Sequence, residues 1–154
     1  MVSNYSKSKG LLSIATSHTG GADGEYGYTK IDQYIIPEGI TITPQRAQDL
    51  DSYRNANGKL KRHVLKHTAS GISFTVRYIT ESELQVLLGY IRTCFGLYGC
   101  EGEPERKVRI RYWDTWKADY SHGYFYIPDT NFQFSGTYKG EPIYLPTTIE
   151  LIEY

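Results

Sequence analysis

The sequence has little that would indicate a cross-linked or membrane-spanning protein. Only two of its 154 residues are cysteines. A disulfide scaffold would carry more, so we expect free thiols in a protein made in the cytosol. The longest apolar run, Val86 to Phe95, is far shorter than the roughly 20 residues that cross a bilayer. The apolar patch Leu11 to Ala15 is too short for a signal peptide. We therefore expect no membrane partner.

Neither sign of charge is in excess. Seventeen Lys and Arg residues balance seventeen Asp and Glu residues, so net charge gives no general attraction to nucleic acid or to an anionic membrane. Methionine occurs once, whereas tyrosine and glycine each occur fifteen times. Tyrosine favours strands and glycine favours turns. The composition therefore predicts one mainly β domain with its own core.

Residues 1–29 are rich in Ser, Gly and Thr and have no usable periodicity. We expect a flexible N-terminal arm or loop there, followed by a single β-sandwich domain with one helix over 30–154. Within that domain, Pro37 to Gly39 predict a tight turn between two short strands. The tetrapeptide TASG, residues 68–71, predicts another turn between two strands.

A single helix is predicted over residues 80–95. Thr80 is a suitable N-cap and Glu83 stands at the capping-box spacing, while Gly96 ends the helix. One apolar stripe should face a sheet. Its expected core positions are Leu84, Leu87, Leu88 and Ile91. The predicted fold class is mainly β (α+β): antiparallel β-sandwich or barrel-like sheets flanked by one amphipathic α-helix at about 80–95.

Aromatic residues are concentrated between 112 and 126. The preceding strand alternates, with Val108, Ile110 and Tyr112 on one face and Lys107, Arg109, Arg111 and Trp113 on the other. In a strand pair about half of the aromatic side chains enter the core or an interface, and exposed ones can stack on sugar rings. A glycan-binding module is therefore the alternative function, with Trp113, Trp116 and Tyr124 as its candidate residues.

Basic residues gather on one predicted hairpin. Six of the seventeen Lys and Arg residues lie between Ser52 and Thr80, with no carboxylate among them. The stretch SYRNANGKLKRHVLKH, residues 52–67, indicates a turn and a basic second strand. It could serve as a basic binding surface, as a metal or catalytic site on two histidines, or as a contact with another copy of the protein.

The histidine spacing argues against a metal site. His63 and His67 on one strand would stand about 13 Å apart, too far to share one ion. The sequence also lacks a nucleophile elbow, a P-loop and a strand-to-helix dinucleotide motif. We therefore expect no enzyme activity, no metal and no cofactor. The favoured interpretation is a subunit interface, formed by Arg54, Asn55, Asn57, Lys59, Lys61 and Arg62.

Two stretches, YRNANGKLKRHVL (53–65) and ISFTVRYITESELQVLL (72–88), resemble a small family of tailed-bacteriophage and prophage tail-module proteins. The resemblance rests on an Arg-Asn-Ala-x-Gly turn, a basic strand, an alternating strand and a helix with a Leu-Leu pair. The matching residues are Arg54, Asn55, Ala56, Gly58, Leu87 and Leu88. The stretch HGYFYIPDTNF (122–132) and the strand TTIELIEY (147–154) resemble later parts of the same family.

The resemblance implies a virion structural protein of the tail, either the tail tube or a tube-associated tip, baseplate or completion subunit. By fold analogy, such a β-sandwich with one flanking helix assembles into rings, expected to be hexameric. The implied partners are further copies of the chain and other tail proteins, with weak contact to DNA in a tube lumen. The implied location is the virion tail, after synthesis in the host cytoplasm.

Overall fold

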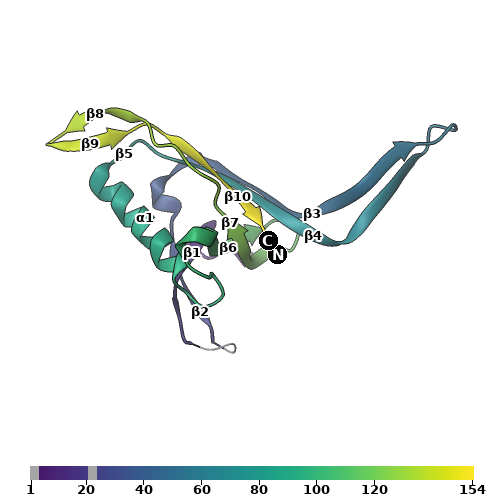
Figure 1. Ribbon diagram of the computed structural model, residues 1–154, viewed down its shortest axis with the longest axis horizontal. Helices are drawn as coiled ribbons and strands as arrows, with labels where there is room; N and C mark the ends of the chain where they lie inside the picture. Colours follow the sequence, from purple (N-terminus) through teal and green to yellow (C-terminus); the bar gives the residue numbers. More distant parts are fainter. Residues whose placement is uncertain (1–3, 21–23) are drawn as a thin grey trace.

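The computed structural model describes residues 4–20 and 24–154, and the side chains of this part except those of 45–53 and 61–69. Antiparallel strands make up most of it, together with one α-helix (Figure 1). The mainly β class with one helix is therefore confirmed. The elements are β1 Leu12–His18, β2 Tyr26–Lys30, η1 Asp32–Tyr34, β3 Ile35–Arg54, β4 Leu60–Val76, β5 Ile79–Thr80, α1 Glu81–Phe95, η2 Glu103–Glu105, β6 Lys107–Asp114, β7 Asp119–Tyr126, β8 Phe134–Tyr138, β9 Glu141–Tyr144 and β10 Thr147–Glu153.

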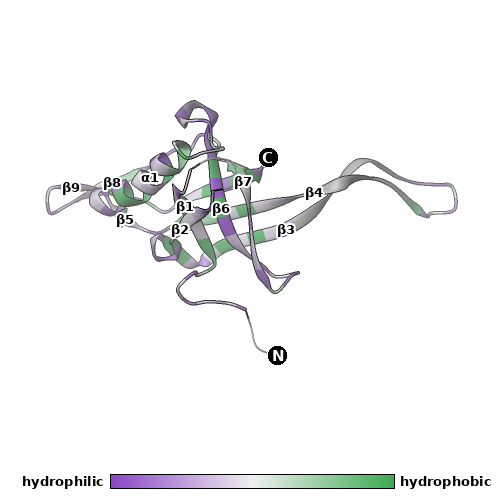
Figure 2. Cartoon of the chain, turned by 90° about the horizontal axis from the view of Figure 1, so that it is seen from below, coloured by the Kyte–Doolittle hydropathy of each residue, from purple (hydrophilic) through white to green (hydrophobic). Residues whose placement is uncertain are grey.

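The strands form two antiparallel sheets. The larger sheet has seven strands in the order β2-β1-β6-β7-β10-β4-β3, and the smaller has three in the order β5-β9-β8. Helix α1 packs against β1 and β6 of the larger sheet and against β9 of the smaller one. The β3–β4 hairpin and the β8–β9 pair lie at opposite ends of the molecule in both views (Figures 1 and 2).

Helix α1 forms where it was predicted and covers the sheet. Its buried residues are Leu84, Leu87, Ile91, Cys94 and Phe95, while Leu88 is half-buried against the same core. The partner strand β6 alternates strictly, with every second residue buried. Each large apolar side chain so buried stabilises the fold by about 1.5–3 kcal/mol. This packing fixes which face of β6 remains open to solvent.

The start of α1 differs in detail from the capping box. Thr80 has the extended backbone of an N-cap, but its side chain bonds to no backbone amide of the helix. The Glu83 carboxylate instead pairs with the Arg77 guanidinium, because the β4–β5 connection brings that cation to the helix N-terminus. The ion pair holds the carboxylate where the helix dipole favours it.

The prediction of a flexible arm over residues 1–29 is wrong for β1 and β2. Leu12, Ile14 and Ala15 are fully buried in the core. The Asp32 carboxylate accepts hydrogen bonds from the amides of Leu11 at 2.8 Å and Leu12 at 2.9 Å. Strand β1 thus lies inside the sheet between β2 and β6, because its short apolar run fills the space beneath α1.

Both predicted internal turns are wrong as well. Residues 37–39 lie within β3, at an irregularity in its pairing with β4 between Ile35 and Ile40. Residues 68–71 continue β4 without a break. Ser70 explains why residues 68–71 stay extended. Its amide donates to the Glu153 carboxylate at 3.0 Å, and its hydroxyl bonds the Tyr112 hydroxyl at 2.8 Å. Cross-strand partners therefore override the local turn preference.

Candidate functional site

A two-stranded arm projects from the larger sheet (Figure 1). Strand β10 pairs with β4 only over Gly71–Val76, whereas β3 and β4 stay paired from Arg46 opposite Ala69 to Arg54 opposite Leu60. No other described strand pairs with this outer part. We call residues 46–69 the β-arm. From its base to its tip it extends about 30 Å, at about 3.4 Å per residue.

The tip of the β-arm is a compact turn that the sequence specifies. The Asn55 amide donates to the Lys59 carbonyl at 2.9 Å, and the Asn55 side-chain oxygen accepts from the amides of Asn57 and Lys59, both at 3.0 Å. Gly58 has φ +79°, a backbone conformation that favours glycine. The Arg54 guanidinium donates to the Gly58 carbonyl at 3.0 Å. The Arg-Asn-Ala-Asn-Gly motif is thus a turn motif.

The predicted interface residues are all placed at this tip. Arg54, Asn57 and Lys59 are exposed and Asn55 is half-buried. Lys61 and Arg62 pair through their backbones with Tyr53 and Ser52 in β3, and their side chains lie outside the described residues. The side chains of His63 and His67 lie there too. Among the described residues, no group of three His, Cys, Asp or Glu side chains could hold a metal ion.

A second surface lies on the open face of β6, opposite the face that α1 covers. Three cations point outward from alternate positions of β6 and stand against tyrosine rings from β2 and β7. We call this surface the tyrosine–cation face. Its members are Tyr26, Tyr28, Lys107, Arg109, Arg111, Tyr120, His122 and Tyr124.

Each cation of this face contacts at least one aromatic ring. Arg109 lies 4.6 Å from the ring centre of Tyr124 and 5.3 Å from that of Tyr26. Arg111 lies 4.8 Å from the ring centre of Tyr28, and the Lys107 ammonium lies 4.7 Å from that of Tyr124. Cation–π contacts of this kind are worth about 0.5–2 kcal/mol each. They hold the charged groups in fixed positions on the sheet.

The charges of the face have no acidic partner within the described part of the chain. There, the ion pair between Arg77 and Glu83 is the only one, and it lies elsewhere. The Arg109 guanidinium donates to Nδ1 of His122. Because a guanidinium can only donate, this ring nitrogen is the unprotonated acceptor. Burial and the nearby charges of Arg109 and Lys117 accordingly lower the pKa of His122.

Two tyrosines of the face are hydrogen-bonded to each other. The Tyr26 hydroxyl donates to the Tyr98 carbonyl at 2.5 Å and accepts from the Tyr124 hydroxyl at 2.6 Å. Burial and the Tyr124 hydroxyl raise the pKa of Tyr26, so its hydroxyl keeps the proton that it donates. Gly99 leaves room for this contact, because a Cβ there would lie 2.6 Å from the Tyr124 hydroxyl. The ring positions therefore depend on the loop after α1.

The three candidate glycan-binding aromatics occupy different settings along the β6–β7 hairpin. Trp113 is half-buried, edge-on to Tyr5 at 5.8 Å and to Tyr120 at 5.3 Å between ring centres. Trp116, in the turn between the strands, is 85% exposed. Tyr124 is held by two cations of its own chain. Only the Trp116 ring is left widely open to a ligand.

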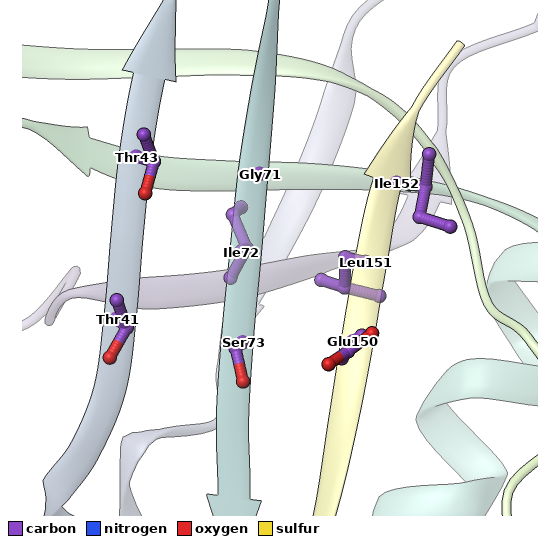
Figure 3. Close-up of a pocket in the computed structure, with 8 residues that line it drawn as sticks. All are labelled: Thr41, Thr43, Gly71, Ile72, Ser73, Glu150, Leu151 and Ile152. Carbon is purple, nitrogen blue, oxygen red and sulfur yellow. The ribbon is translucent and has the colours of Figure 1, made fainter. Parts of the chain in front are cut away.

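A shallow hollow also lies across strands β3, β4 and β10, with a volume of about 240 Å³. Figure 3 shows its short polar side chains, Thr41, Thr43 and Ser73, beside Glu150 on three neighbouring strands. The hollow contains a single carboxylate and no base that could act with it. Its shape and lining show no catalytic arrangement.

Sequence reasoning found half of the tyrosine–cation face. The alternation of residues 107–113 predicted the outward cations, and the burial of β6 confirms it. The tyrosines of β2 were missed because residues 1–29 were expected to form an arm. The available signal was the alternation of Tyr26, Tyr28 and Lys30, which all lie on the strand next to β1.

Together, these features define a mainly β protein with antiparallel sheets, one covering helix, a projecting β-arm and a separate cationic face. Residues 25–154 match a family of unknown function, DUF6711. Because the match spans most of the sequence, the chain belongs to this family. No curated protein and no solved structure matches the chain. Within residues 4–20 and 24–154, no helix is long and apolar enough to cross a membrane.

Proposed function

We propose that the chain is a structural subunit that assembles with copies of itself through the β-arm. From the resemblance of residues 53–88 to phage tail-module proteins, we further propose that this assembly is part of a bacteriophage tail, as a tube or tube-associated ring. The subunit would then reside in the virion and contact other tail proteins. The observation that carries the proposal is the length and isolation of the β-arm.

An isolated two-stranded hairpin is at best marginally stable in water. The backbone of residues 46–69 pairs only within the hairpin, so no further strand of the described chain supports it. Contact with a neighbouring subunit would cover its free backbone edges and stabilise it. The exposed cations at the tip, Arg54 and Lys59, suit an acidic or carbonyl-rich surface on that neighbour.

The opposite end of the molecule offers a second contact surface. Strand β8 is the edge of the smaller sheet, and all five of its residues are exposed. Phe134 on this strand is 65% exposed, and Tyr78 and Tyr138 are exposed as well. An open edge with apolar side chains is a template for pairing with another chain. Different surfaces at the two ends favour head-to-tail contacts, which close into rings or continue as filaments.

The test is the mass of the purified protein by light scattering across a range of concentrations, with electron microscopy of the same samples. We expect rings or tubes. Arg54→Glu with Lys59→Glu should reduce the mass to that of a monomer and leave the circular dichroism spectrum unchanged, because exposed charge changes usually cost less than about 0.5 kcal/mol.

The matched control reverses two exposed charges away from the β-arm, Lys7→Glu with Lys117→Glu, and should assemble as the wild type does. If the Arg54/Lys59 variant assembles normally, the tip is not an interface. A monodisperse monomer that binds polysaccharide with quenching of tryptophan fluorescence would favour the glycan-binding alternative instead, with Trp116 as its main contact.

A further inference from the structure

The tyrosine–cation face has no part in the proposed assembly, since it includes neither the β-arm nor strand β8. Its three cations leave β6 at every second residue, about 6.8 Å apart. Like charges at this spacing repel one another, and none of Lys107, Arg109 and Arg111 forms an ion pair with a carboxylate of the described residues. A surface built in this way is suited to a ligand with regularly spaced negative charges.

The ring contacts orient the guanidinium groups but leave hydrogen-bond donors free. A guanidinium carries five N–H donors. Within the described contacts, Arg109 uses them toward His122 and, at 3.4 Å, the Tyr28 hydroxyl. Among the described contacts, Arg111 donates one hydrogen bond, to the Ser13 hydroxyl at 3.4 Å, and its Nε is buried and therefore closed to a ligand. Phosphate oxygens are acceptors that fit the remaining guanidinium donors.

A hollow lies beside Arg109 on the same face. It has a volume of about 380 Å³ and is lined by Gly24, Glu25, Tyr26, Tyr28, Arg109 and His122. Arg109 and two tyrosine rings therefore line one concave site, and its volume is in the range of small-molecule binding pockets. One carboxylate, that of Glu25, also lies in its wall.

Open aromatic rings flank the row of cations at both ends. Trp116 stands in the turn beyond Trp113, and Tyr126 and Tyr154 are exposed at the other end. The Lys107 ammonium lies 4.8 Å from the ring centre of Tyr154. Rings at the ends of a cationic strip offer stacking surfaces, which only unpaired bases can use.

We propose that the tyrosine–cation face binds single-stranded nucleic acid, with Lys107, Arg109 and Arg111 on successive phosphates and Trp116 and Tyr154 stacking on bases. The binding has little sequence preference, because backbone phosphates and ring faces are common to all bases. It does not depend on the β-arm or on assembly. The site is thus independent of the proposed function.

The experiment measures fluorescence anisotropy of a labelled twelve-nucleotide oligothymidine, titrated with the full chain at several salt concentrations. Lys107→Gln with Arg109→Gln should weaken binding at least tenfold and lower the slope of log K against log salt by about 1.4, or 0.7 per lost phosphate contact. Trp116→Ala should weaken binding about tenfold with no change in that slope, and Trp116→Phe should restore most of it.

The Arg54→Glu/Lys59→Glu variant is the control, and it should bind as tightly as the wild type. If the double variant does not fold, as judged by circular dichroism, Lys107→Gln alone is titrated instead. It should change the slope of log K against log salt by about 0.7. The proposal is overturned if the oligonucleotide does not bind, if a blunt duplex binds equally well, or if a sulfated polysaccharide competes equally while Trp116→Ala has no effect. The last result would define a general polyanion surface.

Discussion

Replacing Leu12 with alanine tests whether the N-terminal strand belongs to the core. The Leu12 side chain is fully buried, and the residue pairs with Tyr112 of β6. Its amide donates to the Asp32 carboxylate at 2.9 Å and its carbonyl accepts from the Ile31 amide at 3.1 Å. These backbone bonds hold the strand in place, so the cavity left by the missing carbons cannot fully collapse. Leucine-to-alanine changes in such sites cost about 2–5 kcal/mol.

A central value of about 3 kcal/mol gives an expected fall in Tm of about 6–12 °C, because a domain of this size loses about 2–4 °C per kcal/mol. The assays are thermal unfolding, which gives the Tm, and urea unfolding, both followed by tryptophan fluorescence and circular dichroism. The urea midpoint should fall with an unchanged slope. Leu60→Ala is the control, since Leu60 is 52% exposed on the β-arm and its loss should cost less than about 0.5 kcal/mol. If both variants unfold at the wild-type midpoint, residues 12–18 are an arm rather than a core strand.

Two further perturbations address the β-arm and the tyrosine–cation face. Replacing residues 47–68 with Asn-Gly should leave the Tm of the monomer, measured by circular dichroism, within a few degrees of the wild type. The reason is that this part of the chain pairs only with itself. A large fall in Tm would mean that the β-arm supports the core. The second concerns pH. Burial, with the charges of Arg109 and Lys117, lowers the pKa of His122 in the folded chain, so the unfolded chain binds the extra proton first as the pH falls below about 6.5. The His122 contribution to stability is therefore complete above that pH and is lost as the pH falls toward the folded pKa. Urea midpoints at pH 7, 6 and 5 should fall less steeply for His122→Gln than for the wild type, and parallel curves would contradict this assignment.

The parts of the fold that were predicted correctly are those with a strong local period. Helix α1 repeats apolar residues on one stripe over fifteen residues, and β6 alternates over eight. Both patterns persist in the structure because the two elements pack on each other. Strand β1 has only a short apolar run, and its place is set by β6, nearly 100 residues further along the chain. That information is not local, so periodicity alone could not reveal it.

The β-arm also shows that local sequence signals are not sufficient, because here they suggest a turn that does not form. Its tip was predicted because Asn55 and Gly58 carry specific turn chemistry. Its length was missed because TASG, residues 68–71, was interpreted as a turn. Within the folded chain Gly71 pairs with Thr43 on one side and Ile152 on the other, so two neighbouring strands hold it extended. Glycine allows a turn but does not require one.

The balanced net charge conceals two separate groups of cations. One lies at the tip of the β-arm, where Arg54 bonds a backbone carbonyl of the turn. The other lies on β6, where Arg109 and Arg111 stand against tyrosine rings. The first group is exposed to solvent, as suits a contact with a neighbouring subunit, whereas the second is held against rings of its own chain before any ligand arrives. Because the two groups lie on different elements, charge changes in one should leave the function of the other intact. Combined variants should therefore show additive effects on assembly and on nucleic-acid binding.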